Sequence, residues 1–241
     1  MKKIAILLLT TVLTAEGLKA QVVERIFGEE KLSLEEIFYE DFEQDLSNWQ
    51  VEGDAGVSLQ YGFLDVDGPA GTEGLHAATI WCRRTFSGPQ VVEYDVRMAD
   101  FSFQAMFNIF LLASMPGEGP GILETGGQRT GQYTEYHQLN NYLVTILNQN
   151  RPEVKRLLCR VRMRLNPGFN LRHESWHLPL QYGRVYHVAY VVRPPEVLVF
   201  LDDVQVGGCS YETVLDQGLH GLRLWNTHSV YDNFRVSRII E

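Results

Sequence analysis

The feature that most constrains the fold is a succession of short strand-like runs separated by turn signals, from about residue 38 almost to the last residue. Runs rich in Val, Ile, Leu, Tyr and Phe alternate with clusters of Gly, Pro, Asn and Asp, and helical periodicity is almost absent. We expect strands over residues 57–66, 77–86, 91–98, 105–113, 133–147, 154–165, 185–193, 197–206, 219–225 and 231–239. This pattern predicts an all-β sandwich in a single domain.

The sequence divides into three segments. Two lysines, a short apolar run and then Ala20 are typical of a secretory signal peptide over residues 1–20. Residues 21–36 are a charged lead-in, in which Ser33 is the expected N-cap of a short helical turn. The sandwich domain is expected over residues 37–241. We therefore expect an exported protein, periplasmic or extracellular, that does not insert into a membrane.

Charge and cysteine content exclude some classes of site. The formal net charge of −9 disfavours nucleic acid as a partner, but a local basic cluster can still bind an acidic polysaccharide. Cys82 and Cys159 lie in apolar runs and are expected to be buried free thiols, and the lack of a Cys-x-x-Cys pair argues against a thiolate metal site. No cofactor or catalytic metal is expected. Asp41 or Asp232 is a candidate ligand for a structural calcium ion.

Residues 128–142 form the densest polar segment. If this segment is a strand, one face carries Tyr133, Glu135, His137 and Asn141, and the other carries Tyr136, Gln138, Asn140 and Tyr142. Neither face is apolar, so we expect at least one face to line a sugar-binding cleft, where rings stack on sugars and amides bond hydroxyls. The alternative is a solvated outer face.

A second polar pattern is the alternation of Arg160, Arg162 and Arg164 on one strand face. In an acidic protein this stripe indicates an anionic ligand such as a uronate, or else an exposed face that Asp and Glu neutralise. His173 and His177 have the spacing of a helical metal pair, but no helix is expected there, which argues against zinc.

Four motifs together carry a resemblance to a known family. They are Arg129-x-Gly131-x-Tyr133-x-x-Tyr136-His137-x-x-Asn140-x-Tyr142, His76 with Trp81, Asn166-Pro167-Gly168-Phe169, and Gly221-x-Arg223 with Tyr231-x-Asn233-Phe234. The chain resembles, from Phe38 to Val236, a family of secreted bacterial jelly-roll proteins of unknown function, often encoded beside pectin and rhamnogalacturonan degradation genes. The resemblance implies a concanavalin-A-like jelly-roll sandwich and a role in polysaccharide breakdown.

Three functions fit these residues. A polysaccharide lyase needs a base and a group that neutralises a uronate carboxylate; its candidate catalytic residues are Arg129, Tyr133, Glu135, Tyr136 and His137. A glycoside hydrolase needs two carboxylates about 5 to 9 Å apart, such as Glu135 with Glu93 or Asp95. A lectin-like module needs only binding groups. The expected substrate-binding residues are His76, Trp81, Asn140, Tyr142, Arg162, Arg164, Arg223, Trp225 and His228.

Overall fold

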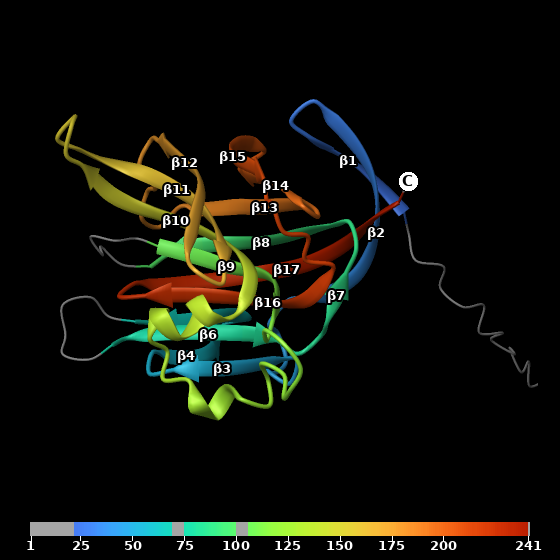
Figure 1. The fold of residues 1–241 in the computed structure, drawn as a ribbon. Coiled ribbons are helices and arrows are strands. Elements are labelled where there is room, and N and C mark those ends of the chain that lie inside the picture. Colours follow the sequence, from blue (N-terminus) through green and yellow to red (C-terminus); the bar gives the residue numbers. More distant parts are fainter. Residues whose placement is uncertain (1–21, 69–74, 100–105, 241) are drawn as a thin grey trace, which may run out of the picture.

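The computed structural model describes residues 22–68, 75–99 and 106–240, so the expected signal peptide lies outside the described residues. Within these ranges the chain is almost entirely β-structure, and two curled antiparallel sheets pack face to face as a sandwich (Figure 1). The all-β expectation is confirmed. Among the described residues, no helix is long and apolar enough to cross a membrane.

The first sheet contains the strands at both ends of the described chain. Its order is β1 (Val22–Phe27), β2 (Glu30–Glu40), β17 (His228–Ile240), β8 (Gln90–Met98), β13 (Val185–Arg193), β14 (Glu196–Leu201) and β15 (Val204–Ser210). The hairpin β4 (Gly56–Gln60) and β5 (Phe63–Asp67) joins this sheet through β17.

The second sheet carries the surface described below. Its order is β12 (Asn170–His177), β11 (Arg156–Asn166), β10 (Asn140–Arg151), β9 (Met106–Ser114), β16 (Gln217–Trp225), β6 (Ala77–Cys82) and β3 (Trp49–Gly53). The short strand β7 (Phe86–Ser87) pairs with the start of β16.

Alternate residues of both sheets point into one shared apolar core. Phe42 and Phe234 are fully buried in it, and Trp49 meets Phe234 edge to face at a centroid distance of 5.0 Å. Each such ring contributes about 1.5–3 kcal/mol by burial. Phe234 lies opposite Glu40 where β17 pairs with β2.

The cysteines of the chain behave as expected. Cys82 and Cys159 are buried free thiols, and burial raises the pKa of each to about 12. Neither thiol therefore ionises near neutral pH.

The lead-in over residues 21–36 differs from expectation. It forms no helical turn; instead β1 and β2 make a hairpin that packs across the outer face of the first sheet. Leu32 and Leu34 alternate inwards, and Phe27 meets Phe200 at 5.6 Å. Period-two burial of these side chains outweighs the local capping signal.

The expected strand over residues 133–147 is wrong in its first part. Tyr133–Gln138 is a 3-10 helix, and β10 begins only at Asn140. The short 3-10 helix Gly126–Gln128 precedes it. These helices belong to a segment, residues 115–139, that packs on the outer face of the second sheet; we call it the wall (Figure 1).

Candidate ligand-binding groove

One row of directly paired residues crosses the outer face of the second sheet from edge to edge. In sheet order from β3 to β12, the row is Glu52, Thr79, Arg223, Asn108, Thr145, Arg162 and Glu174. Directly paired residues share a face of a sheet. All seven side chains are polar or charged, whereas the residues on either side of them along β6, β16, β9, β10 and β11 point into the core.

The wall covers one side of this polar row. Trp81, Phe110 and Leu143 lie on the same outer face, two residues along their strands, and pack beneath Ile122 and Tyr136 of the wall. On the other side of the row lie Met106, Leu147 and Trp225. The wall therefore projects from the sheet along one edge of the polar row, and the polar row forms the surface next to the wall.

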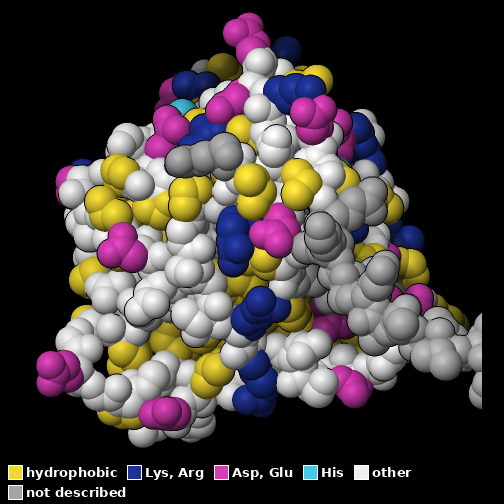
Figure 2. Space-filling view, turned by 90° about the vertical axis from the view of Figure 1, so that its right-hand side faces the viewer, with side chains coloured by type: hydrophobic (Ala, Val, Ile, Leu, Met, Phe, Trp, Pro, Cys, Tyr) yellow, Lys and Arg dark blue, Asp and Glu magenta, His cyan; other side chains and the backbone are white. Residues whose placement is uncertain are grey.

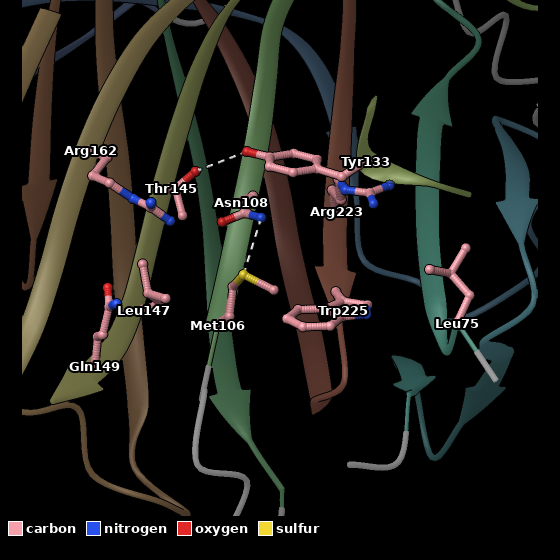
Figure 3. Close-up of a pocket in the computed structure, with 10 residues that line it drawn as sticks. All are labelled: Leu75, Met106, Asn108, Tyr133, Thr145, Leu147, Gln149, Arg162, Arg223 and Trp225. Atoms are coloured by element: carbon pink, nitrogen blue, oxygen red, sulfur yellow. Dashed lines mark hydrogen bonds between the residues drawn. The ribbon is translucent and has the colours of Figure 1, made fainter. Parts of the chain in front are cut away.

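A groove of about 400 Å³ follows the foot of the wall (Figure 3). The described residues that line it are Leu75, Met106, Asn108, Tyr133, Thr145, Leu147, Gln149, Arg162, Arg223 and Trp225. Figure 3 shows the polar groups of Tyr133, Arg223, Asn108, Thr145 and Arg162 on the wall side of the groove, and Met106, Leu147, Gln149, Trp225 and Leu75 on the side away from the wall.

A buried ion pair fastens the wall to β3. Arg129 donates to both carboxylate oxygens of Glu52, at 2.8 and 2.6 Å, and Tyr136 donates its hydroxyl to the same carboxylate at 3.0 Å. The Glu52 side chain is 1% exposed. Arg129 and Tyr136, expected as catalytic residues, are thus held inside the protein, and burial raises the pKa of Tyr136.

Arg223 supports the wall from below. It is 2% exposed, and its guanidinium donates to the Thr79 hydroxyl and the Gly131 carbonyl oxygen, both at 2.8 Å. The guanidinium lies 4.9 Å from the ring centroid of Tyr133 and 4.7 Å from that of Tyr136. This packing holds Tyr133 over the groove, with its hydroxyl 3.5 Å from that of Thr145 (Figure 3).

The arginine stripe on β11 is neutralised at one position only. Arg160 donates to Glu174 at 2.9 Å. Arg162 and Arg164 make no ion pair with the described residues, and their Nε and Nη1 atoms, respectively, are buried without a hydrogen-bond partner there. Burial, together with the neighbouring Arg164 and Arg160, lowers the pKa of Arg162 to about 10. The groove floor therefore carries a guanidinium, that of Arg162, which makes no ion pair with the described residues.

Arg162 and Arg164, which make no ion pair with the described residues, contrast with another surface of the molecule. On the face seen in Figure 2, Lys and Arg side chains are interspersed with Asp and Glu. The net charge of the chain is −9. The stripe at Arg162 is thus a local reversal of the overall charge.

A family model described as "Domain of unknown function (DUF6250)" matches residues 73–234, about two thirds of the chain. The chain belongs to this family. The DUF6250 match includes the wall and every strand of the second sheet except β3. No curated protein matches the chain in sequence.

Solved structures show the same fold as the DUF6250 chain. A protein of unknown function with a galectin-like fold from Bacillus subtilis has a TM-score of 0.69 at 19% identity, over 86% of this chain and 99% of that one. The exoplasmic/lumenal domain of VIP36, in a Ca²⁺/Man3GlcNAc-bound form, has a TM-score of 0.61 at 8% identity, over 86% and 91%. An endo-β-1,3-glucanase from Pyrococcus furiosus has a TM-score of 0.56 at 13% identity, over 91% and 98%. These likenesses confirm the jelly-roll sandwich.

Several residues expected at the site lie elsewhere in the DUF6250 domain. Trp81 is fully buried and stacks on Phe110 at 5.3 Å beneath the wall. Tyr142 points into the core between the sheets and donates to the Thr213 carbonyl oxygen at 2.8 Å. The prediction that these two rings bind substrate is wrong, because each faces protein on all sides.

His137 lies behind Tyr133 rather than in the groove. Its ring stacks on Phe169 at 3.9 Å and meets Tyr133 at 4.7 Å. Burial lowers the pKa of His137, with Arg223 and Arg164 acting in the same direction. Its Nε2 atom is buried without a hydrogen-bond partner among the described residues, and His137 is not among the described residues that line the groove.

The other expected residues make local contacts. Glu135 accepts hydrogen bonds from the backbone and hydroxyl of Thr130, at 2.8 and 3.0 Å. Asn140 donates to the Ser114 hydroxyl, and His228 pairs with Asp65 in the first sheet at 2.9 Å. His76, which directly precedes β6, is likewise not among the groove residues.

Four expected residues do meet in the groove: Tyr133, Arg162, Arg223 and Trp225. Sequence reasoning missed Asn108 and Thr145, although each is a single polar residue inside an otherwise apolar run. Among the described residues, no cluster of three His, Cys, Asp or Glu side chains is placed to hold a metal ion. The structural calcium expected at Asp41 or Asp232 stays a prediction.

Proposed function

We propose that the groove of the DUF6250 domain binds an acidic polysaccharide, with uronate units as its anionic groups. The observation that carries this proposal is Arg162, a largely buried guanidinium on the groove floor without a carboxylate partner among the described residues. A buried cation without a partner is costly. A bound carboxylate offsets that cost and forms charge-assisted hydrogen bonds with the guanidinium.

The rest of the lining suits a sugar. Trp225 is 36% exposed and offers a ring face for stacking, while Asn108, Thr145 and Gln149 offer amide and hydroxyl groups. The similar fold of an endo-β-1,3-glucanase, and of a VIP36 domain bound to Man3GlcNAc, supports a carbohydrate as the ligand class.

The finer proposal is that the protein cleaves this polysaccharide as a lyase. Tyr133, rather than His137, is the base, because its hydroxyl enters the groove beside Thr145. Tyr133 acts as a phenolate that takes the proton α to the uronate carboxylate, and Arg162 stabilises the enolate that forms. The electron pair of the enolate then forms a carbon–carbon double bond, the bond to the glycosidic oxygen breaks, and the Tyr133 hydroxyl returns its proton to that leaving oxygen. The product carries an unsaturated uronate.

Hydrolysis by paired carboxylates fits the groove less well. None of the described lining residues is Asp or Glu. At one end of the polar row, Glu52 is buried in its pair with Arg129; at the other, Glu174 pairs with Arg160. A binding module without activity remains the second candidate, since binding needs no base.

The test uses pectic, alginate and glycosaminoglycan polymers, with a neutral glucan for comparison. We expect the purified protein to bind an acidic polymer and not the glucan, and Arg162→Met to weaken binding at least about tenfold. The control is Arg238→Met, which removes an exposed arginine paired with Glu35 on the first sheet. Equal affinity of both variants, or preference for the glucan, would overturn the proposal.

The same samples separate lyase from binding module. A rise in ultraviolet absorbance from the unsaturated uronate supports the lyase, and Tyr133→Phe should abolish it while binding persists. Binding without absorbance or new reducing ends supports the module, and new reducing ends alone support a hydrolase. Export to the periplasm or beyond is also proposed, and cell fractionation tests it.

A further inference from the structure

The outer face of the second sheet continues beyond the groove toward β12. Next to the polar row lies a second row, in which Met106 pairs with Leu147, Leu147 with Arg160, and Arg160 with Trp176. At the other end, Trp225 follows Arg223 by two residues and so shares its face; Figure 3 shows its ring beside Met106. One face thus carries a tryptophan at each end of an apolar and cationic row.

Trp176 is held in a defined orientation. Its indole N–H donates to Glu174 Oε1 at 3.0 Å. The guanidinium carbons of Arg160 and Arg151 lie 5.1 and 5.3 Å from its ring centroid. Such packing reduces the rotamer freedom that the indole would otherwise lose on binding a ligand.

Arg160 connects this tryptophan to the groove. It donates to Gln149, a groove-lining residue, at 2.9 Å and to Glu174 at 2.9 Å. The surface from the groove to Trp176 is therefore one hydrogen-bonded network rather than two separate patches.

Charge along this surface matches an anionic chain. Three arginines follow it, namely Arg151, Arg160 and Arg162, and the ion pairs they make with described residues involve only Glu153 and Glu174. The strands β16, β9, β10, β11 and β12 lie side by side. At about 4.8 Å per strand, the backbones that carry Trp225 and Trp176 are about 19 Å apart, a span that takes several sugar units.

We propose that Trp176 is a distal sugar-stacking subsite, and that the bound ligand is a stretch of acidic polysaccharide that crosses the strands from Trp225 to Trp176. This inference rests on the proposed function of the groove. It adds that affinity depends on chain length, because a short oligomer fills the groove at Arg162 without reaching β12.

The test measures binding of galacturonate dimers and hexamers by calorimetry. Trp176→Ala should weaken hexamer binding about tenfold and leave dimer binding unchanged. The matched control is Tyr61→Ala, an aromatic side chain that is 96% exposed at the β4–β5 turn of the other sheet. It should change neither affinity, and thermal melting of both variants confirms that they fold.

The outcomes are distinct. Unchanged hexamer affinity in Trp176→Ala, or equal losses for dimer and hexamer, would overturn the distal subsite and leave the groove proposal standing. If the wild-type protein binds neither oligomer nor any of the acidic polymers, the proposed function fails, and the longer path fails with it.

Discussion

Replacing Arg129 with Met tests whether the wall depends on its buried ion pair. The substitution keeps an unbranched apolar stem but removes both hydrogen bonds to Glu52, and those to Thr125 and the Ile122 carbonyl oxygen. The Glu52 carboxylate, 1% exposed, is then left with the hydroxyl of Tyr136 as its remaining side-chain donor.

The size of the effect follows from this burial. Breaking a buried ion pair by removing one partner costs about 3–5 kcal/mol. That cost falls on the docking of the wall, because the core between the two sheets contains neither partner. We therefore expect the wall to open locally before the sandwich unfolds. A loss of about 3 kcal/mol corresponds to roughly a hundredfold faster hydrogen exchange in the wall.

Hydrogen exchange followed by mass spectrometry measures this directly. Peptides from residues 122–138 should exchange faster in Arg129→Met, whereas peptides from β8 and β13 should not. The double variant Arg129→Met/Glu52→Gln also removes the buried negative charge of Glu52 and should recover part of the protection against hydrogen exchange. Unchanged exchange in the single variant would refute the reasoning and leave the wall held by its apolar contacts alone.

Two further predictions concern stability elsewhere. Hydrogen bonds to Asp95 and Glu93 raise the pKa of His187 to about 9. This stabilisation is complete below the unfolded-state pKa of about 6.5 and is lost as the pH rises through about 9. The unfolding free energy should therefore fall by about 1–2 kcal/mol across that pH window, a figure reduced because a third of the His187 side chain is exposed. Chemical denaturation at a series of pH values should show a weaker pH dependence of the unfolding free energy in His187→Gln than in the wild type. An equal pH dependence in both proteins would contradict this. Gly221→Ala places a Cβ 2.4 Å from the Trp81 ring, so denaturant titration should show a loss of about 1–3 kcal/mol, and unchanged stability would contradict the packing.

The strands were predictable where one side of the segment is apolar. The strand expected over residues 185–193 has those bounds in the structure, because its buried valines and tyrosines give a clear signal. The expected strand over residues 57–66 is instead two strands of a hairpin. Tyr61 and Gly62 turn the chain there with positive φ values of 54° and 76°, and a non-glycine residue at positive φ is hard to foresee from sequence.

The wall was misread because its polar side chains bond to one another. Polarity on both faces of residues 133–142 indicated a strand beside a cleft. In the structure, Glu135 bonds Thr130, and Tyr136 and Arg129 meet at Glu52, more than seventy positions away in the sequence. A partner so distant along the chain leaves no local signal.

The groove itself was half predictable. The alternation of arginines located Arg162, but which neighbours share its row depends on strand register, which the sequence does not fix. Asn108 and Thr145 therefore went unnoticed, although a lone polar residue in an apolar strand is a usable signal. Conversely, Tyr142 stood in a polar motif yet points into the core.

The most direct measurement is a crystal structure of the protein with a bound galacturonate oligomer. We predict a carboxylate within hydrogen-bonding distance of the Arg162 guanidinium and a sugar ring stacked on Trp225, at the foot of the wall. An oligomer bound on the first sheet, or one whose carboxylates all turn away from Arg162 toward solvent, would contradict the account.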